Sequence, residues 1–270
     1  MIRRDDAGFV QAPALATSGS ETSRAGSQAR ESGAAAMNLL ALDTSTEQAV
    51  VTLASGSGEI LTAEPGPGRR HGRDLIPQLR DLLARGGIRP GELDAIAVGV
   101  GPGSYTGLRV GVTAAKTLAY ATGATLLAVD SLHVIGRNAP DEASRIVVIA
   151  DAQRNDLYVA RLTRTAPSLP PSPDGETRIE PLDAWVRSLE SGTVVLGPAL
   201  DLPRIRSAVP SEFLAPPEVP NHPIARHLLD LARDAFQAGR RENPWLLEPC
   251  YLRRSAAEDQ WDARGPRPRG

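Results

Sequence analysis

The sequence has few of the residues on which several common kinds of site depend. Its 270 residues include one cysteine, Cys250, so neither a disulfide within the chain nor a zinc site held by cysteines can form. Aromatic residues make up 4%, too few for the stacking platforms that bind single-stranded nucleic acid. The 30 basic and 32 acidic residues nearly cancel, so any work on RNA would need phosphate contacts supplied by another molecule.

Long apolar runs are missing as well. Every apolar stretch stops well short of the roughly 18 residues that identify a membrane-spanning helix. The first 36 residues lack the apolar centre of a signal peptide. We therefore expect no membrane association, and the single cysteine fits a reducing cytoplasm.

Lysine occurs only once, at Lys116, among 30 basic residues. A lysine kept in a chain that otherwise uses arginine can mark a position that needs a compact point charge. A chance codon explains it equally well, so the role of Lys116 stays open.

The four histidines do not form a recognisable metal site. They are His71, His133, His222 and His227, and none of them pairs at the i, i+4 spacing that places two ligands on one helix face. No serine, histidine and aspartate set stands out either. The sequence therefore predicts no catalytic residue and no metal ligand in this chain.

Composition divides the chain into four parts. Residues 1–36 are rich in Ser, Ala, Gly and Arg without apolar periodicity, which predicts a disordered extension. Met37 then opens an apolar strand pattern, and it is an alternative start of the protein. We place a first lobe at 37–140, a second at 141–256, and a disordered tail at 257–270.

The two predicted lobes open in the same way. NLLALDT and QAVVTLAS (residues 38–44 and 48–55) read as a hairpin, and RIVVIADAQRNDLYVARLT (145–163) repeats strand, acidic turn and strand. Helical spacing of leucines predicts a helix over 71–85. A second helix is predicted over 104–121, and strands mixed with helices indicate an α/β protein with mixed sheets.

Each repeated hairpin carries an acidic turn. The first contains Asp43, Thr44 and Ser45, a carboxylate beside hydroxyls that suits a magnesium-bound phosphate. The same residue types are also ordinary turn formers. Asp151 stands at the matching place in the second half, where either a nucleotide-facing turn or a plain loop fits.

A glycine-rich turn precedes the second predicted helix. Glycines there permit close approaches that a Cβ would block, and Ser104 or Thr106 can cap the helix, whose free amides attract anions. No Lys-Ser or Lys-Thr follows, so this is not a Walker motif. The motif residues are Gly101, Gly103, Ser104, Tyr105, Thr106, Gly107 and Arg109.

Small residues recur every four positions on that helix. Gly107, Gly111, Ala115 and Ala119 form a stripe on one face. Such a stripe lets another helix approach closely, whether from a partner or from the same chain. Glycine inside a helix costs roughly 1 kcal/mol relative to alanine, so packing on this face has to compensate for two glycines.

Taken together, these motifs resemble one family. The segments that carry the resemblance are LLALDTST, GPGSYTGLRVG followed by AAKTLAY, DAQRNDLYVA, and PCYLRR at 249–254. In this order they are similar to the TsaB family, over about residues 37–256. The glycine segment is shared with TsaD, the catalytic paralogue. The resemblance implies an actin-like, RNase H-like α/β fold of two similar lobes with mixed sheets and flanking helices.

The resemblance also implies a role. TsaB-like proteins are non-catalytic partners of TsaD, which transfers threonylcarbamoyl to a tRNA adenosine beside the anticodon with the help of the ATPase TsaE. The implied partners are thus a TsaD-like subunit, a TsaE-like ATPase and tRNA through the complex, with a homodimer possible without the partner. ATP, magnesium and metal belong to the complex, and this chain requires no cofactor of its own.

The family's dimerisation helices correspond to residues 71–85 and 104–121. The interface residues that this implies are His71, Leu75, Ile76, Leu79, Leu82, Gly107, Gly111, Ala115, Lys116 and Ala119. TsaD-like proteins hold metal partly through an HxxxH motif, and here Ser131 and Ile135 stand at its two histidine positions. Two departures are Tyr105 in place of the family's usual Phe and DAQRNDLY in place of a DARM-type run.

Two enzymatic readings compete with the subunit. An independent ATP-dependent kinase or ATPase of the same fold would use Asp43, Asp151 and the glycine turn to bind Mg-ATP. The second lobe offers no clear adenosine-binding glycine pair except Gly197 with Pro198. A metallopeptidase would need the histidine pair that this chain lacks.

Overall fold

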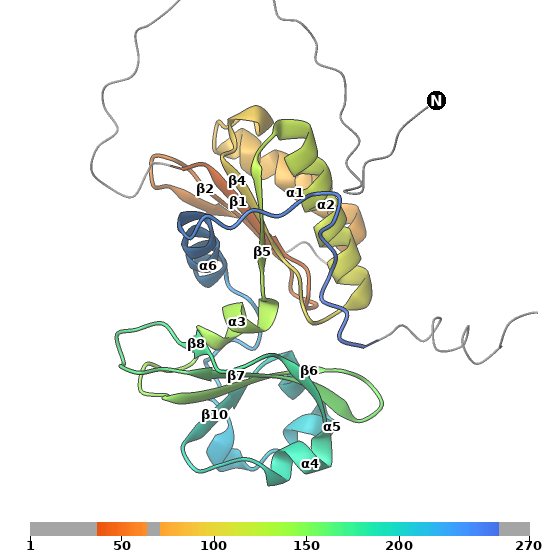
Figure 1. The fold of residues 1–270 in the computed structure, drawn as a ribbon, viewed down its shortest axis with the longest axis vertical. Helices are drawn as coiled ribbons and strands as arrows, with labels where there is room; N and C mark the ends of the chain where they lie inside the picture. Colours follow the sequence, from red (N-terminus) through yellow and green to blue (C-terminus); the bar gives the residue numbers. More distant parts are fainter. Residues whose placement is uncertain (1–36, 64–70, 254–270) are drawn as a thin grey trace, which may run out of the picture. The chain divides into compact units, whose positions relative to one another are not determined.

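The computed structural model describes residues 37–63 and 71–253, all of which fall within one unit of the chain. The predicted disordered segments 1–36 and 257–270 lie outside the described residues. The described chain forms an α/β protein with two five-stranded sheets (Figure 1).

The first sheet has the order β3-β2-β1-β4-β5. It contains β1 (Leu39–Asp43), β2 (Val50–Ala54), β3 (Ile60–Thr62), β4 (Ala95–Gly99) and β5 (Thr125–Val129). The β1–β2 pair is antiparallel, as predicted for the opening hairpin, and so is the β2–β3 pair, whereas β1, β4 and β5 run parallel to one another. Parallel strands are covered on both faces in proteins, and β1, β2 and β4 are buried along their whole length.

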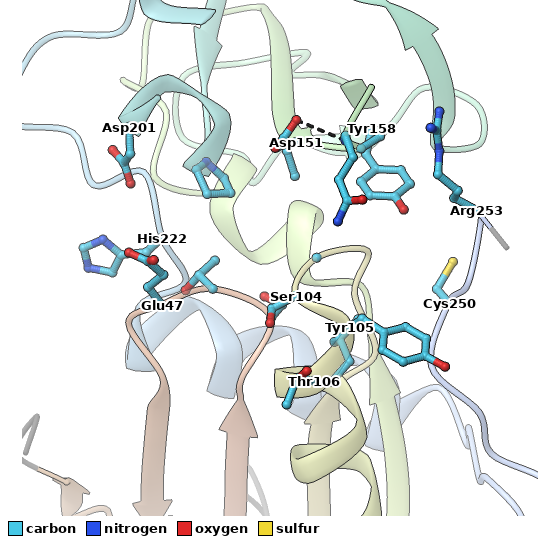
Figure 2. A pocket seen from close by; sticks show the side chains of 18 of the residues that line it. Glu47, Ser104, Tyr105, Thr106, Asp151, Tyr158, Asp201, His222, Cys250 and Arg253 are labelled. Carbon is cyan, nitrogen blue, oxygen red and sulfur yellow. Dashed lines mark hydrogen bonds between the residues drawn. The ribbon is translucent and has the colours of Figure 1, made fainter. Parts of the chain in front are cut away.

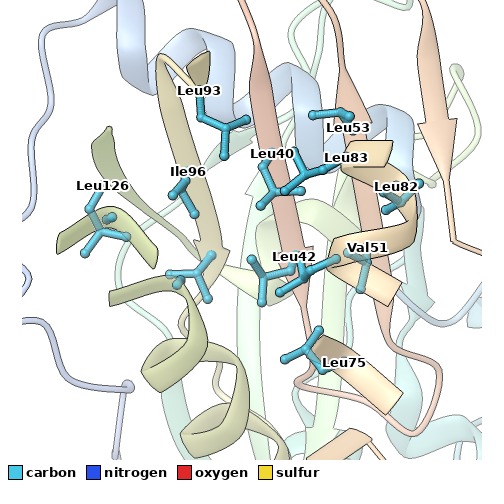
Figure 3. Close-up of a cluster of buried hydrophobic side chains, with 14 of the residues drawn as sticks. Leu40, Leu42, Val51, Leu53, Leu75, Leu82, Leu83, Leu93, Ile96 and Leu126 are labelled. Carbon is cyan, nitrogen blue, oxygen red and sulfur yellow. The ribbon is translucent and has the colours of Figure 1, made fainter. Parts of the chain in front are cut away.

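Alternate side chains of β1 enter two different cores. Leu40 and Leu42 pack with helix α1 (His71–Arg85) and helix α2 (Tyr105–Thr122) on one face (Figure 3). Leu39 and Ala41 pack on the opposite face with helix α6 (Ala225–Gln237). The period-two alternation of a strand therefore builds a three-layer lobe. Each buried leucine contributes roughly 1.5–3 kcal/mol relative to an exposed one.

Helix α6 returns from late in the sequence to the first sheet. Leu228 and Leu229 are fully buried against β1 and β5, so the face of this sheet that α1 and α2 leave open is covered. The segment 141–256 thus supplies a layer of the first lobe as well as the second sheet. The division of the chain at residue 140 into two domains stays a prediction.

The second sheet has the order β10-β6-β7-β8, and β9 also pairs with β7. Its strands are β6 (Arg145–Asp151), β7 (Asp156–Thr163), β8 (Ser172–Pro173), β9 (Arg178–Pro181) and β10 (Thr193–Leu196). The β6–β7 hairpin confirms the predicted repeat of the opening unit. One core of this lobe surrounds the buried Trp185.

Short helices complete the lobes. They are α3 (Ser131–Gly136), α4 (Leu182–Arg187) and α5 (Pro203–Arg206), with single 3-10 turns at Pro90–Glu92, Pro198–Asp201 and Ser211–Phe213. Helix α3 follows β5, and the Asp130 carboxylate caps it by accepting hydrogen bonds from the amides of Leu132 and His133.

The segment after α6, residues 238–253, contains no helix or strand, and we call it the C-terminal strap. The amide of Glu242 donates to the carbonyl of Leu126 on the outer strand β5, at 2.9 Å. Farther along, Lys116 Nζ donates to the carbonyl of Leu247 at 2.7 Å. The strap therefore covers part of the edge of the sheet and runs beside α2 (Figure 1).

Candidate functional site

A cleft of about 890 Å³ opens between the two sheets. The turns after β1 and β4 line it from the first lobe, and the turn after β6 lines it from the second. Figure 2 shows Asp151 and Tyr158 across from Ser104 and Tyr105, with Cys250 and Arg253 of the strap at one side. Residues far apart in the sequence thus meet in one cleft.

The glycine-rich turn binds to the chain's own first hairpin. The Ser104 amide donates to the carbonyl of Ser45 at 2.7 Å, and a Cβ added at Gly103 would lie 2.4 Å from that same carbonyl oxygen. Ser104 is also the N-cap of α2, because its hydroxyl accepts from the amide of Gly107 at 3.2 Å. The predicted cap and close approach are confirmed.

Helix α2 sits on the same hairpin through its glycines. A Cβ added at Gly107 would lie 2.0 Å from the Thr44 carbonyl oxygen, and one at Gly111 would lie 2.2 Å from Thr44 Oγ1. Thr44 Oγ1 in turn donates to the carbonyl of Gly107 at 2.7 Å. This contact compensates for the poor helix propensity of the two glycines.

This packing corrects part of the predicted partner interface. Seven of its residues are buried inside this chain: Leu75, Leu79, Leu82, Gly107, Gly111, Ala115 and Ala119. The small-residue stripe faces the sheet and its turn, and the leucines of α1 enter the first core. Of the others, Ile76 is 60% exposed and Lys116 holds the strap. The His71 side chain lies outside the described part. That the outer faces of the two helices bind a partner stays a prediction.

Asp43 and Thr44 are likewise not available to a nucleotide. Both are fully buried, and neither lines the cleft, whereas Ser45 and Asp151 do. Asp43 Oδ1 accepts from the Ser45 amide at 2.8 Å, and Oδ2 has no hydrogen-bond partner among the described residues. Burial raises the pKa of the Asp43 carboxyl above its usual value. The predicted nucleotide-facing role of these two residues is corrected to a structural one.

The second acidic turn is engaged by an arginine. Arg204 donates to Asp151 Oδ1 at 2.7 Å, and that oxygen also accepts from the Gln153 amide at 3.1 Å. Gln153, Arg154 and Asn155 all have positive φ, near 60°, a conformation that costs residues other than glycine free energy. A network of turn hydrogen bonds holds them, including that from the Leu182 amide to the carbonyl of Asn155.

The strap brings three further residues to the cleft. The Cys250 amide donates to the carbonyl of Val100 at 2.8 Å, and the Tyr251 ring lies 5.1 Å from that of Tyr105. Arg109 Nε donates to the Tyr251 hydroxyl at 3.1 Å. Arg253 pairs with Asp156 of β7 and so ties the strap to the second lobe. Sequence reasoning did not place these side chains in the cleft, although the PCYLRR segment carried a family resemblance.

Burial shifts the pKa values of two titrating groups that line the cleft. Burial, with a smaller effect of Asp130, raises the pKa of the Cys250 thiol, which disfavours the reactive thiolate. Burial lowers the pKa of His222, against the opposing effect of Asp201. Across residues 37–63 and 71–253 no group of three or more His, Cys, Asp or Glu side chains could hold a metal ion.

No helix within the described ranges is long and apolar enough to cross a membrane.

Comparison with known proteins identifies a family model and several relatives that match this chain. The family model of TsaD, tRNA N6-adenosine threonylcarbamoyltransferase, matches residues 65–169. The tRNA threonylcarbamoyladenosine biosynthesis protein TsaB of Haemophilus influenzae is 34% identical over 130 residues, which cover 47% of this chain and 55% of the relative. TsaB of Escherichia coli is 27% identical over 231 residues, which cover 82% of this chain and 96% of the relative.

A solved structure agrees with these relatives. The structure of YeaZ from Pseudomonas aeruginosa superposes with a TM-score of 0.68 at 28% identity and covers 80% of this chain and 100% of that one. The chain thus spans about half the length of the H. influenzae relative and almost all of the E. coli and P. aeruginosa ones.

Two mixed sheets, each with a strand–acidic turn–strand hairpin, and a cleft between them define an actin-like α/β protein. Within that class, the range matched by the threonylcarbamoyltransferase model, residues 65–169, includes the glycine turn. The TsaB relatives, the YeaZ structure and the transferase family model together support the TsaB family for this chain.

Proposed function

We propose that this protein is the non-catalytic partner subunit that binds and activates a TsaD-like transferase in the synthesis of tRNA threonylcarbamoyladenosine. The role in this biosynthesis is supported by the TsaB relatives, one of which is matched over 96% of its length. The modified base is the adenosine beside the anticodon, and the work takes place in the cytoplasm, where tRNA is modified.

The observation that carries the proposal is the occupation of the glycine turn by the chain itself. Thr44 fills the space beside Gly107 and Gly111, and the Ser45 carbonyl accepts from Ser104. Asp43 is buried, and Asp151 is paired with Arg204. A phosphate with magnesium would need open amides and free carboxylates at these places. This arrangement supports a subunit that lends a surface and leaves the chemistry to its partner.

The proposed partner surface is the outer face of α1 and α2. Ile76 on α1 is 60% exposed, and Tyr120 on α2 is 66% exposed. Ser131 and Ile135 are buried core residues of α3, which supports leaving metal binding to the transferase. A TsaE-like ATPase and tRNA would join through the transferase, and a homodimer is the alternative assembly without it.

Direct binding tests the proposal. Purified full-length protein is mixed with the TsaD-like subunit of the same organism and followed by sedimentation velocity, and each protein is also run alone. We expect a new species with the mass of one subunit of each kind. Steady ATP hydrolysis by this chain alone, with no such species, would favour the independent ATPase instead.

A further inference from the structure

Large apolar side chains exposed to solvent are concentrated on one part of this protein. Within the described ranges nine such residues are exposed, and six of them lie on α2 or on the strap: Tyr105, Tyr120, Trp245, Leu246, Tyr251 and Leu252. Only ten aromatic residues occur in the whole sequence. Exposed aromatic residues that gather on one surface mark interaction sites more often than scattered ones do.

Two of these side chains, Tyr120 and Trp245, are in contact, and Leu246 follows Trp245 in the sequence; we call these three residues the aromatic patch. The Tyr120 and Trp245 rings meet edge to face with centroids 5.0 Å apart. The three residues are 66%, 73% and 74% exposed, respectively. Most of their surface is therefore left open to solvent, although tryptophan and leucine are among the side chains that gain most from burial.

The strap holds this patch in place before any partner arrives. The Trp245 amide donates to Asn243 Oδ1 at 2.9 Å, and the Leu246 amide donates to the carbonyl of Asn243 at 3.0 Å. Leu247 packs against the first core, and its carbonyl accepts from Lys116 Nζ at 2.7 Å. A surface that is already ordered loses less conformational entropy when it binds.

The size of the patch fits part of a protein interface. Because an aromatic side chain presents roughly 150–250 Å², these three residues offer roughly 400 Å². A standard interface buries about 800 Å² on each partner. The aromatic patch therefore supplies about half of such an area, and the neighbouring outer faces of α2 and α1 would supply the rest.

We propose that the aromatic patch is the principal contact through which this chain binds the TsaD-like transferase, an inference that rests on the proposed function. The transferase model matches residues 65–169, which include α1 and α2 whole and end before the strap. Members of the transferase family therefore have a segment similar to this helix pair, and the outer face of the pair in this chain is the proposed partner surface. Tyr120 extends the aromatic patch onto that face.

RNA is a less suitable ligand for the aromatic patch than a protein. Stacking platforms for bases are accompanied by basic side chains that bind phosphates. Here the Lys116 amine is engaged by the Leu247 carbonyl. Arg240 and Arg241 lie on the strap, with Arg241 donating to the Arg240 carbonyl, but Glu242 and Glu248 are nearer to Trp245 and Leu246 in the sequence. A protein surface rich in apolar and aromatic side chains suits the patch better.

The test compares the affinity of full-length variants for the purified transferase by isothermal titration calorimetry. Trp245→Ala and Tyr120→Ala should each weaken binding by about 10-fold or more, as expected for central interface residues, and Trp245→Phe should keep most of the affinity. Leu169→Ala is the matched control, because Leu169 is 50% exposed but lies between β7 and β8 of the second lobe. Its affinity should equal that of the wild type, and thermal melts should show all variants folded.

The outcomes separate this inference from the proposed function. If the wild type binds the transferase and Trp245→Ala and Tyr120→Ala bind it with the same affinity, the inference about the aromatic patch is wrong, but the proposed partner role stands. A wild-type homodimer that these variants dissociate, with transferase affinity unchanged, would assign the patch to a second copy and also overturn the inference. No binding of the wild type to the transferase would remove the proposed function itself.

Discussion

Replacing Gly107 with alanine should destabilise the protein, although alanine favours helices. The new Cβ would lie 2.0 Å from the Thr44 carbonyl oxygen, so the turn after β1 or helix α2 must move. Overpacking costs about 1–3 kcal/mol, and alanine returns about 1 kcal/mol of helix propensity. Because the contact is with backbone, we take the upper end of the overpacking cost. The free energy of unfolding should then fall by about 2 kcal/mol net, which lowers the Tm by about 4–8 °C for a chain of this size.

Gly111 provides the comparison, because its added Cβ would meet the side chain of Thr44. Gly111→Ala alone should cost about 1 kcal/mol net. Thr44→Ala removes the Oγ1 that lies 2.2 Å away and leaves the Thr44 Cβ at 3.4 Å. The double variant should therefore be more stable than the sum of the two single changes predicts, by about 1 kcal/mol. The same Thr44→Ala change should not rescue Gly107→Ala.

Urea denaturation of the five variants, monitored by circular dichroism, measures these differences. Thr117→Ala on the exposed face of α2 is the control, and it should match or slightly exceed wild-type stability. If Gly107→Ala is as stable as the wild type, or if Thr44→Ala rescues both glycine variants equally, α2 is not seated on Thr44 as described.

Three further outcomes follow from the buried groups and the strap. Burial raises the pKa of Asp43 above 3.8, so its contribution to stability should be lost as pH rises from that value through its folded-state pKa. Asp43→Asn should therefore reduce the loss of stability with rising pH, although the buried Asp130, whose pKa is also raised by burial, should keep part of it; pH curves of thermal melts that are parallel for the two proteins would contradict the assignment. Lys116→Met removes a hydrogen bond from a charged group, worth about 1.5–3 kcal/mol, so amides of the strap should exchange with deuterium about 10–150-fold faster; unchanged exchange would show that other contacts hold the strap. Arg253→Gln breaks the ion pair with Asp156 and should speed modification of the Cys250 thiol several-fold, and an unchanged rate would mean that this pair does not fix the end of the strap.

Local patterns were sufficient to predict much of the fold. Apolar runs interrupted by acidic turns predicted both hairpins, and leucine spacing predicted α1 with its observed bounds. A hydroxyl cap at Ser104 or Thr106 was predicted for the second helix, and Ser104 is the cap. These features depend on neighbours in the sequence.

The surface that each apolar face meets was not predictable in the same way. Periodicity showed that Gly107 and Gly111 share a helix face, but it could not tell a partner's helix from the chain's own Thr44. Nor could it show that α6 crosses back to the first sheet. The strap has no periodicity at all, because its residues are placed one by one through contacts with α2, β5 and β7.

The central claim is tested most directly by a reconstitution in which one component is omitted. Purified TsaD-like transferase, TsaE-like ATPase, threonylcarbamoyl-adenylate, ATP and unmodified tRNA are incubated with and without this protein, and the modified adenosine is measured by mass spectrometry. We predict modification only when this protein is present, and none from this protein alone. Equal modification in its absence would contradict the subunit role.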